Sequence, residues 1–300
     1  MVTSSISPIL LQARHQFEDL IEVVRPELHR YVARMVGSAI DGEDVVQEAV
    51  LKAYYSLPPE RAESNLRGWL FRIAHNKAID FLRRSNLQTM EQLDEHFPAK
   101  CETDHPLEQQ ELSAMALSVF LKLAPRQRSC VILKDVLDYS LAEVSEFLDA
   151  SVPEIKAVLH RGRYRLRELG KNTETVKPVL EEREQELLTD YVNRFNARDF
   201  DGVRQMLADE VRLDLLNKTK MSGSSEVAGN YFQNYQRIED WSLKLGTVEN
   251  RPAIIVFDSP ENALRPAYFM LLEWAGERVS QIRDYRYARH VMEAAEITVV

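Results

Sequence analysis

The chain has 300 residues, 45% of them hydrophobic, and a formal net charge of −9 at pH 7. This length predicts two or three domains, and neither a membrane-spanning run nor a signal peptide is indicated, so we expect a cytoplasmic protein without a membrane partner. The two cysteines, Cys101 and Cys130, match no metal-ligand spacing, and we therefore expect no metal and no cofactor.

An all-helical domain is predicted over residues 12–86. Its apolar periodicity favours helices at about residues 12–36, 42–56 and 66–84, with two prolines in the connection before the third helix. The third helix combines an apolar face with aromatic and basic residues. The apolar face comprises Leu66, Leu70, Ala74, Ala78 and Phe81. The other side carries Trp69, Arg72, Asn76 and Arg83.

This second arc has the chemistry of a nucleic-acid contact. Cations can meet phosphates, while an indole and an amide can stack on exposed bases or hydrogen-bond to them. For the segment taken alone, an ordinary amphipathic helix with a solvated outer face is an equally good interpretation. Residues 87–112 follow, with one Lys against seven Asp and Glu, and they predict a poorly structured acidic linker.

A second helical domain is predicted over residues 113–172, and its end has the pattern of a helix-turn-helix. Residues 141–148 form a first short helix, residues 149 and 150 the turn, and Ser151 and Glu154 a capping box that starts a second helix. From Lys156 to Lys171 there are six Lys and Arg against one acid. A cationic helix of this kind suits the major groove, although a helical hairpin with a solvated basic face is the alternative.

The rest of the chain changes in character after a short linker, residues 173–181. Two helices, at about residues 182–197 and 199–208, are followed by segments rich in β-branched and aromatic residues. Helices followed by a run of strands predict an α+β domain over residues 182–300 with an antiparallel sheet. The expected strands are residues 210–216, 241–248, 253–257, 267–274 and 278–287.

Residues 12–170 resemble the extracytoplasmic-function sigma factors, a class of bacterial RNA polymerase sigma factors. Three motifs in order carry the resemblance: Asp41–Tyr54, Trp69–Arg84, and Leu123–Arg128 followed by residues 140–169. The resemblance implies two all-α domains, sigma region 2 and sigma region 4, joined by the acidic linker. It also implies two partners, core RNA polymerase and promoter DNA.

The first motif is similar to the family segment that grips the clamp helices of the largest polymerase subunit. The implied core-binding residues are Asp41, Asp44, Gln47 and Glu48. Three of them, Asp44, Gln47 and Glu48, would lie on one side of a helix and offer carboxylates and an amide to a basic, grooved partner. A solvated polar face fits this spacing just as well.

The second and third motifs resemble the segments that open and read the −10 element and that read the −35 element. The implied −10 residues are Asn65, Trp69, Arg72, Asn76, Lys77, Arg83 and Arg84, with Asn65 in a loop that would form a pocket for an extruded base. The implied −35 residues are Ser151, Pro153, Glu154, Lys156, Ala157, His160, Arg161, Arg163 and Arg167. Base capture rather than a chemical step would drive opening, so we expect no catalytic residue.

The C-terminal domain resembles SnoaL-like domains, in which a curved sheet and helices form a cone. Tyr191–Asp201 resembles the opening of such domains, and Ile282–His290 the tail seen when they are fused to sigma factors. We expect a regulatory role, with any ligand or partner of this domain unidentified. Its acid–base candidates are Asp214, Asp284 and His290, and the aromatic candidates for a pocket are Tyr191, Trp241, Tyr268 and Tyr287.

Two other functions stay open at this point. A helix-turn-helix regulator that acts independently of core polymerase would explain residues 140–169, but it leaves Asp41–Tyr54 and Trp69–Arg84 without a role. A SnoaL-like enzyme with a DNA-binding appendage would require turnover by residues 182–300. Co-purification with core polymerase tests the first alternative, and an activity screen of the C-terminal domain tests the second.

Overall fold

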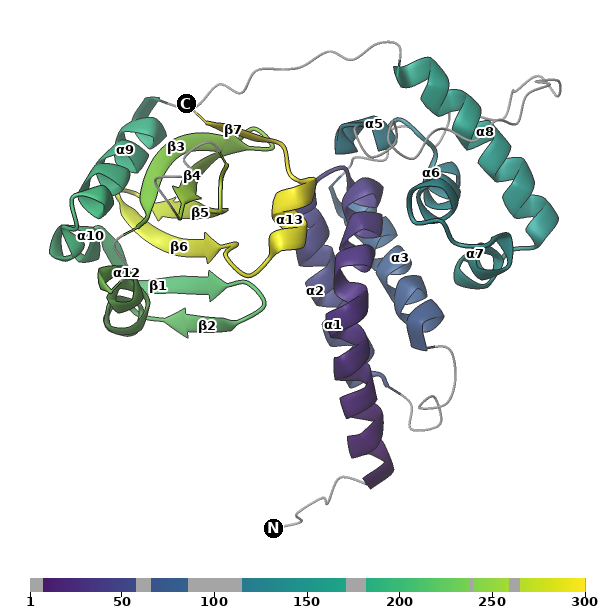
Figure 1. Ribbon diagram of the computed structural model, residues 1–300, viewed down its shortest axis with the longest axis horizontal. Helices are drawn as coiled ribbons and strands as arrows, with labels where there is room; N and C mark the ends of the chain where they lie inside the picture. Colours follow the sequence, from purple (N-terminus) through teal and green to yellow (C-terminus); the bar gives the residue numbers. More distant parts are fainter. Residues whose placement is uncertain are drawn as a thin grey trace. The chain divides into compact units, whose positions relative to one another are not determined.

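The computed structural model describes residues 8–57, 66–85, 115–170, 182–237, 240–258 and 265–299 (Figure 1). They fall into two compact units, one within residues 1–174 and the other within residues 175–300. The two predicted linkers and Asn65 lie outside the described residues. Among the described helices, none combines the length and the apolar character needed to cross a membrane.

The first unit begins with the three helices expected from the sequence. They are α1 (Pro8–Val36), α2 (Ala39–Tyr55) and α3 (Leu66–Arg84), and each packs against the other two. Ser38 starts α2, because its hydroxyl accepts a hydrogen bond from the Asp41 N–H at 3.1 Å. On α3, Leu70, Ala74 and Ala78 are buried as expected.

A second group of helices follows in the same unit. It comprises α5 (Leu117–Phe120), α6 (Pro125–Val131), a π-helical turn η2 (Ile132–Val136), α7 (Leu141–Leu148) and α8 (Val152–Gly170). A capping box between Ser140 and Glu143 starts α7, and Asp149 ends it in the left-handed region at φ 51°. The helix-turn-helix predicted from the sequence is therefore present.

The two groups of helices share one hydrophobic core. Buried side chains of α1 and α3 are continuous with those of α5, α6 and α7. Gly162 of α8 allows a close contact with α6, since a Cβ there would lie 2.8 Å from Cγ2 of Val131 and 3.2 Å from the carbonyl oxygen of Gln127. The described residues of the first unit therefore pack around a common core.

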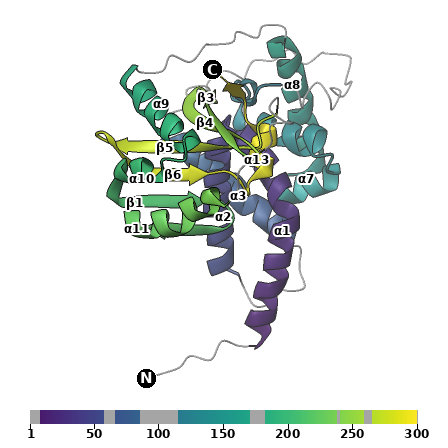
Figure 2. The ribbon, with the colours of Figure 1, turned by 60° about the vertical axis from the view of Figure 1, so that its left-hand side comes forward.

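The second unit is an α+β fold built on one seven-stranded sheet (Figure 2). The strand order is β2-β1-β6-β5-β4-β3-β7. The strands are β1 (Leu207–Leu215), β2 (Thr219–Ser222), β3 (Ser242–Val248), β4 (Arg251–Phe257), β5 (Tyr268–Ala275), β6 (Arg278–Asp284) and β7 (Ile297–Val299). The helices are α9 (Glu182–Asn196), α10 (Phe200–Gln205), α11 (Ser224–Glu226), η3 (Val227–Phe232), α12 (Gln233–Gln236) and α13 (Arg289–Ala294).

The expectation of a purely antiparallel sheet is wrong at one position. β1 pairs with β6 in parallel, whereas the other neighbours are antiparallel. Hairpins dictate antiparallel neighbours, but β1 and β6 are distant in the sequence, and the helical segment from α11 to α12 separates β2 from β3. That segment, β2, β7 and α13 were not among the elements expected from the sequence.

Candidate nucleic-acid interface

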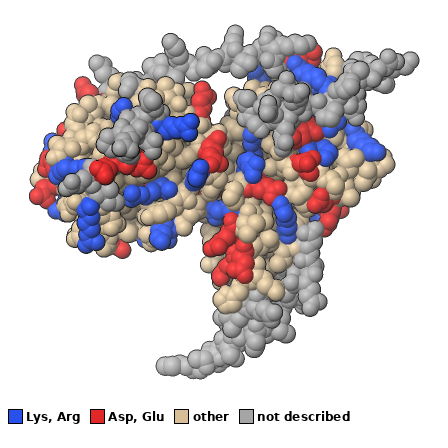
Figure 3. Space-filling model, viewed as in Figure 1, with Lys and Arg blue, Asp and Glu red and all other residues tan. Residues whose placement is uncertain are grey.

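The outward face of α8 carries most of the predicted −35 residues. Ser151, Pro153, Lys156, Ala157 and Arg161 are exposed, and His160 and Arg167 are half-buried. Lys and Arg side chains lie along this helix in the space-filling view (Figure 3). Buried Ile155, Leu159 and Leu166 hold the opposite side of α8 against the core. The packing therefore presents cations and small side chains to the exterior, as a groove-binding helix requires.

Glu154 does not complete the capping box predicted with Ser151. The Ser151 hydroxyl accepts a hydrogen bond from the Glu154 N–H at 3.4 Å, as expected, but the Glu154 carboxylate pairs with Nη2 of Arg126 at 2.6 Å. Arg126 lies in α6, so this ion pair ties the start of α8 to a different helix. The Arg126 guanidinium also adds a positive charge beside the first turns of α8, which are predicted to contact the bases.

Arg163 is the exception among the predicted −35 residues. Its guanidinium donates two hydrogen bonds to the Asp135 carboxylate, at 2.9 and 2.6 Å, and the two side chains are only 8% and 3% exposed. The assignment of Arg163 to DNA is therefore not supported, because this side chain fixes α8 to η2 inside the fold. Its position was a usable signal, since Arg163 falls on the same helical stripe as the buried Leu159 and Leu166.

The predicted −10 residues of α3 divide into exposed and packed groups. Arg72, Asn76, Arg83 and Arg84 are exposed, whereas Trp69 and Lys77 are half-buried. Trp69 packs against the hydrophobic core, so only part of its indole is accessible for stacking. Arg72 is engaged, because its Nη2 donates to the carbonyl oxygen of Glu146 in α7 at 2.8 Å.

The structure brings together residues that the sequence assigned to two different partners. Glu48 of α2 pairs with Nζ of Lys77 at 3.0 Å and with Nη2 of Arg84 at 3.8 Å, both on α3. Asp41, Asp44 and Gln47 lie along α2 and are half-buried. Ion pairs between exposed side chains contribute little stability and exchange partners readily. The candidate core-binding face and the candidate −10 face therefore meet at Glu48.

Two apolar residues on α2 were missed in the sequence reading. The side chains of Leu51 and Tyr55 are 51% and 80% exposed, and they follow Glu48 at helical spacing. Exposed aliphatic and aromatic side chains beside polar groups are typical of protein interfaces. The buried stripe of α2 contains Ala49 and Ala53. Leu51 and Tyr55 lie outside this stripe, and that position could have identified them as exposed apolar residues from the sequence.

The second unit holds a polar cluster inside its aromatic core. The buried Asp284 carboxylate accepts hydrogen bonds from the Tyr231 hydroxyl at 2.6 Å, the Tyr235 hydroxyl at 3.4 Å and the Arg286 N–H at 2.8 Å. The hydroxyls of Tyr235 and Tyr268 are joined by a hydrogen bond at 2.7 Å. Burial raises the pKa of Asp284, and the hydrogen bond from Tyr231 opposes this rise.

The other acid–base candidates of this unit lie in different surroundings. Asp214 pairs with Nζ of Lys220 at 3.0 Å, and His290 is half-buried on α13. Tyr287, one of the aromatic candidates for a pocket, is 49% exposed. Asp284 is the one buried member of the three acid–base candidates. Tyr231 and Tyr235, which contact it, were not among the predicted residues, because they lie in the helical segment that the sequence reading did not identify.

Two family models match the first unit. The model described as Sigma-70 region 2 matches residues 20–87, and the model described as Sigma-70, region 4 matches residues 114–166. The chain is 27% identical over 307 residues to the ECF RNA polymerase sigma factor SigG of Mycobacterium tuberculosis strain CDC 1551, covering 90% of this chain and 81% of that protein. The two family models fall on α1–α3 and on α5–α8.

Two solved structures are similar at lower identity. The crystal structure of the Mycobacterium tuberculosis extracytoplasmic function sigma factor SigJ has a TM-score of 0.34 at 19% identity, covering 89% of this chain and 95% of that one. The crystal structure of a putative ketosteroid isomerase from Kribbella flavida DSM 17836 has a TM-score of 0.27 at 17% identity, covering 33% of this chain and 73% of that one.

Proposed function

We propose that this chain is an RNA polymerase sigma factor of the extracytoplasmic-function type. In this proposal its C-terminal unit is SnoaL-like, and its individual surfaces divide the work of promoter recognition. Region 2 (α1–α3) engages the clamp helices of the largest subunit of core polymerase and the −10 element, and region 4 (α5–α8) reads the −35 element. The observation that carries this proposal is the pair of basic, outward helical faces on α3 and α8, each backed by a buried apolar side.

Region 4 would read duplex DNA through α8. Lys156 and Ala157 stand in its first turns, where a recognition helix meets base edges, and Arg161 and Arg167 follow where phosphates pass. Arg126 adds a cation at the start of the helix. Arg163 has a positioning role in this proposal, because its ion pair with Asp135 sets the orientation of α8.

Region 2 would capture single-stranded DNA through α3. Opening a duplex exposes bases that need new partners, and each stack of a base on an aromatic ring contributes about 1–3 kcal/mol. The partly accessible indole of Trp69 supplies such a ring, and Asn76, Arg83 and Arg84 supply polar and cationic groups along the same helix. Asn65 remains a proposed member of the base pocket. No residue in this scheme makes or breaks a covalent bond.

The polymerase contact would form on α2. Asp41, Asp44, Gln47 and Glu48 provide the polar part, while Leu51 and Tyr55 provide an apolar part that loses its water on binding. When core polymerase binds at Glu48, Lys77 and Arg84 lose their ion-pair partner and become available to DNA phosphates. Core binding would in this way prepare the neighbouring −10 face.

The C-terminal unit would modulate activity without a catalytic role. In the described chain, its one buried acid–base candidate, Asp284, already accepts hydrogen bonds from two phenols and a backbone N–H. A carboxylate held in this way stabilises the fold, whereas a general base needs access to a substrate proton. The unit has its own hydrophobic core, so it can act on promoter activity as a separate body.

Run-off transcription with purified, sigma-free core polymerase on a promoter library tests the proposed function. The expected result is initiation from a subset of templates that share two sequence elements. Failure to initiate at any template, with core polymerase shown to be active with another sigma factor, would contradict it. DNA binding without polymerase would then favour the helix-turn-helix regulator.

Removing the C-terminal unit should change initiation. The variant ends at residue 174, where the first compact unit ends, so its hydrophobic core stays complete. We expect either its affinity for core polymerase or its initiation rate to differ from that of the full chain, measured side by side on one selected template. Equal values for both quantities would rule out the modulating role.

A further inference from the structure

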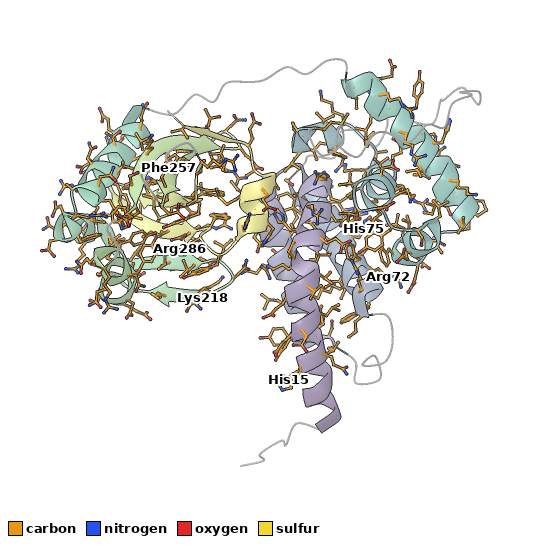
Figure 4. All side chains as sticks on the ribbon, in the orientation of Figure 1. His15, Arg72, His75, Lys218, Phe257 and Arg286 are labelled. Carbon is orange, nitrogen blue, oxygen red and sulfur yellow. The ribbon has the colours of Figure 1, made fainter. Side chains whose placement is uncertain are left out.

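The first turn of α8 carries an acidic side chain on a helix that is otherwise basic. Glu154 is one of two acids in α8, and the other, Glu168, is in the last turn. Because DNA is a polyanion, a carboxylate in the turn that meets base edges is unfavourable unless it has a specific role. Side chains project from α8 on the side away from α6 (Figure 4). The proposed role of this surface in reading the −35 element leaves the presence of Glu154 unexplained.

An ion pair holds the Glu154 carboxylate at the edge of α8 next to α6. Oε1 of Glu154 lies 2.6 Å from Nη2 of Arg126, a residue of α6. The Glu154 and Arg126 side chains are 41% and 67% exposed, so both are accessible to a bound duplex. A carboxylate has about four lone-pair positions, and the ion pair therefore leaves it able to accept a further hydrogen bond.

The backbone around Glu154 is fixed, and the surface beside it is open. The Glu154 N–H donates to the Ser151 hydroxyl at 3.4 Å, and the next residue, Ile155, is buried in the core. Ala157, three residues further on the helix, is exposed and adds little bulk beside Glu154. The first turn of α8 can thus approach base edges closely, with the carboxylate in a defined position.

A carboxylate distinguishes the base edges in the major groove because it can only accept hydrogen bonds. Guanine presents two acceptors there, N7 and O6, and thymine presents the O4 acceptor and a methyl group. Adenine places its N6 donor next to the N7 acceptor, whereas cytosine presents the N4 amino group as a donor alone. Cytosine is therefore the base that best complements Glu154.

Arg126 makes such a contact feasible on a polyanion. Its guanidinium offsets the repulsion between the Glu154 carboxylate and the DNA phosphates, and the ion pair restricts the directions in which the carboxylate points. α6 packs against α8, so the position of Arg126 relative to the first turn of α8 is set by the core of the fold. In this arrangement Arg126 influences base recognition through Glu154.

We propose that Glu154 selects a cytosine in the −35 element by accepting a hydrogen bond from its N4 amino group, and that Arg126 is the positioning residue for this contact. The inference rests on the proposed sigma function and adds a specificity-determining residue to it. Arg161 and Arg167 hold phosphates in the same scheme, so base choice and general affinity belong to different side chains of α8.

Selection from a library of duplex promoters, randomised in the −35 element, tests the base preference. The full chain in complex with core polymerase should prefer cytosine at one position by about 5-fold to 150-fold over guanine or thymine. Glu154→Ala should lose this preference and keep the preferences at all other positions. Glu154→Gln should move it to adenine, because an amide can pair with adenine N6 and N7 together.

Two variants on the same helix serve as matched controls. Glu168→Gln removes the other acid of α8 and should leave every base preference unchanged. Arg161→Ala should weaken binding to all templates by the same factor and lower the salt dependence, because a phosphate contact carries no sequence information. Since the Arg126–Glu154 pair is exposed, its removal should cost little stability, and urea unfolding checks that each variant is folded.

A double-mutant cycle separates positioning by Arg126 from an independent phosphate contact. Arg126→Ala should reduce the cytosine preference, which a purely structural role would not do, and Arg126→Lys should retain part of it because the charge is kept. Arg126→Ala should also weaken binding to the selected template more in the wild-type chain than in the Glu154→Ala chain. Equal losses in the two backgrounds would overturn the positioning role.

The outcomes separate this inference from the proposed function. If the wild-type chain and Glu154→Ala both initiate transcription and select the same base at every position, the inference is overturned and the sigma function stands. If no template is initiated, the proposed function fails, and the selection is repeated by DNA binding of the chain without polymerase. A cytosine preference that Glu154→Ala removes would then still support the role of Glu154, and an unchanged selection would overturn it.

Discussion

Arg163→Ala should destabilise the first unit by about 3–5 kcal/mol, because it leaves the Asp135 carboxylate buried without its partner. The side chains of this pair are 8% and 3% exposed, so water cannot replace the guanidinium at low cost. Arg161, two residues earlier, is exposed. Arg161→Ala should therefore change the free energy of unfolding by no more than about 0.5 kcal/mol.

In promoter binding the ranking of the two variants should be reversed, with Arg161→Ala showing the larger direct effect. For Arg161→Ala in complex with core polymerase, we expect weaker promoter binding and a salt dependence lowered by about one phosphate contact. Urea unfolding of residues 1–174 measures stability through Trp69, which is the one tryptophan of that segment. A stable Arg163→Ala variant with a salt dependence lowered as in Arg161→Ala would return Arg163 to the DNA-binding set.

Arg163 also shows why a helix could be predicted more accurately than the role of a side chain on it. Helix periodicity and caps are local, and they identified α3, α7 and α8 within a few residues. The partner of Arg163 is 28 positions earlier in the chain, in a π-helical turn that no local pattern announces. Charge on a helix therefore predicted a basic face, but only the tertiary packing separates Arg161 from Arg163.

The side-chain contacts of Tyr31 have the same origin. Tyr31 meets His75 across 44 positions and Ser129 across 98, so no spacing rule connects them. Tyr31 and Phe71 are core residues, and part of that core is supplied by α6 and α7. Contacts between residues this far apart in the chain are set by tertiary packing, which the sequence motifs did not predict.

The C-terminal unit was predicted in outline, and its polar centre was not. The five expected strands are present, because β-branched and aromatic runs between turns are a local signal. Tyr231 and Tyr235 lie in η3 and α12, a segment without a clear apolar period, so their approach to Asp284 could not be anticipated. The parallel pairing of β1 with β6 joins strands that are distant in the sequence, so no local pattern predicts it.

Tyr231→Phe should destabilise the second unit by about 1.5–3 kcal/mol, since the lost hydroxyl donates to an ionised carboxylate. Tyr191→Phe is the matched control. Tyr191 is also fully buried and its pKa is raised in part by Asp284, but its hydroxyl has no hydrogen-bond partner in the described chain. We expect Tyr191→Phe to leave the free energy of unfolding nearly unchanged or slightly higher.

The difference between these two variants should depend on pH in a defined direction. Burial raises the pKa of Asp284, so its protonation favours the folded state, and this contribution to stability is lost as pH rises from the unfolded pKa through the folded pKa. The hydrogen bond from Tyr231 is strongest to the ionised form. The loss caused by Tyr231→Phe should therefore be full above the folded pKa and shrink as the pH falls below it, whereas Tyr191→Phe should show no such trend. Unfolding curves from pH 4 to pH 8, followed through Trp241 and Trp274 in a Trp69→Phe background, measure both variants, and a pH-independent loss would mean that Asp284 does not titrate in this range.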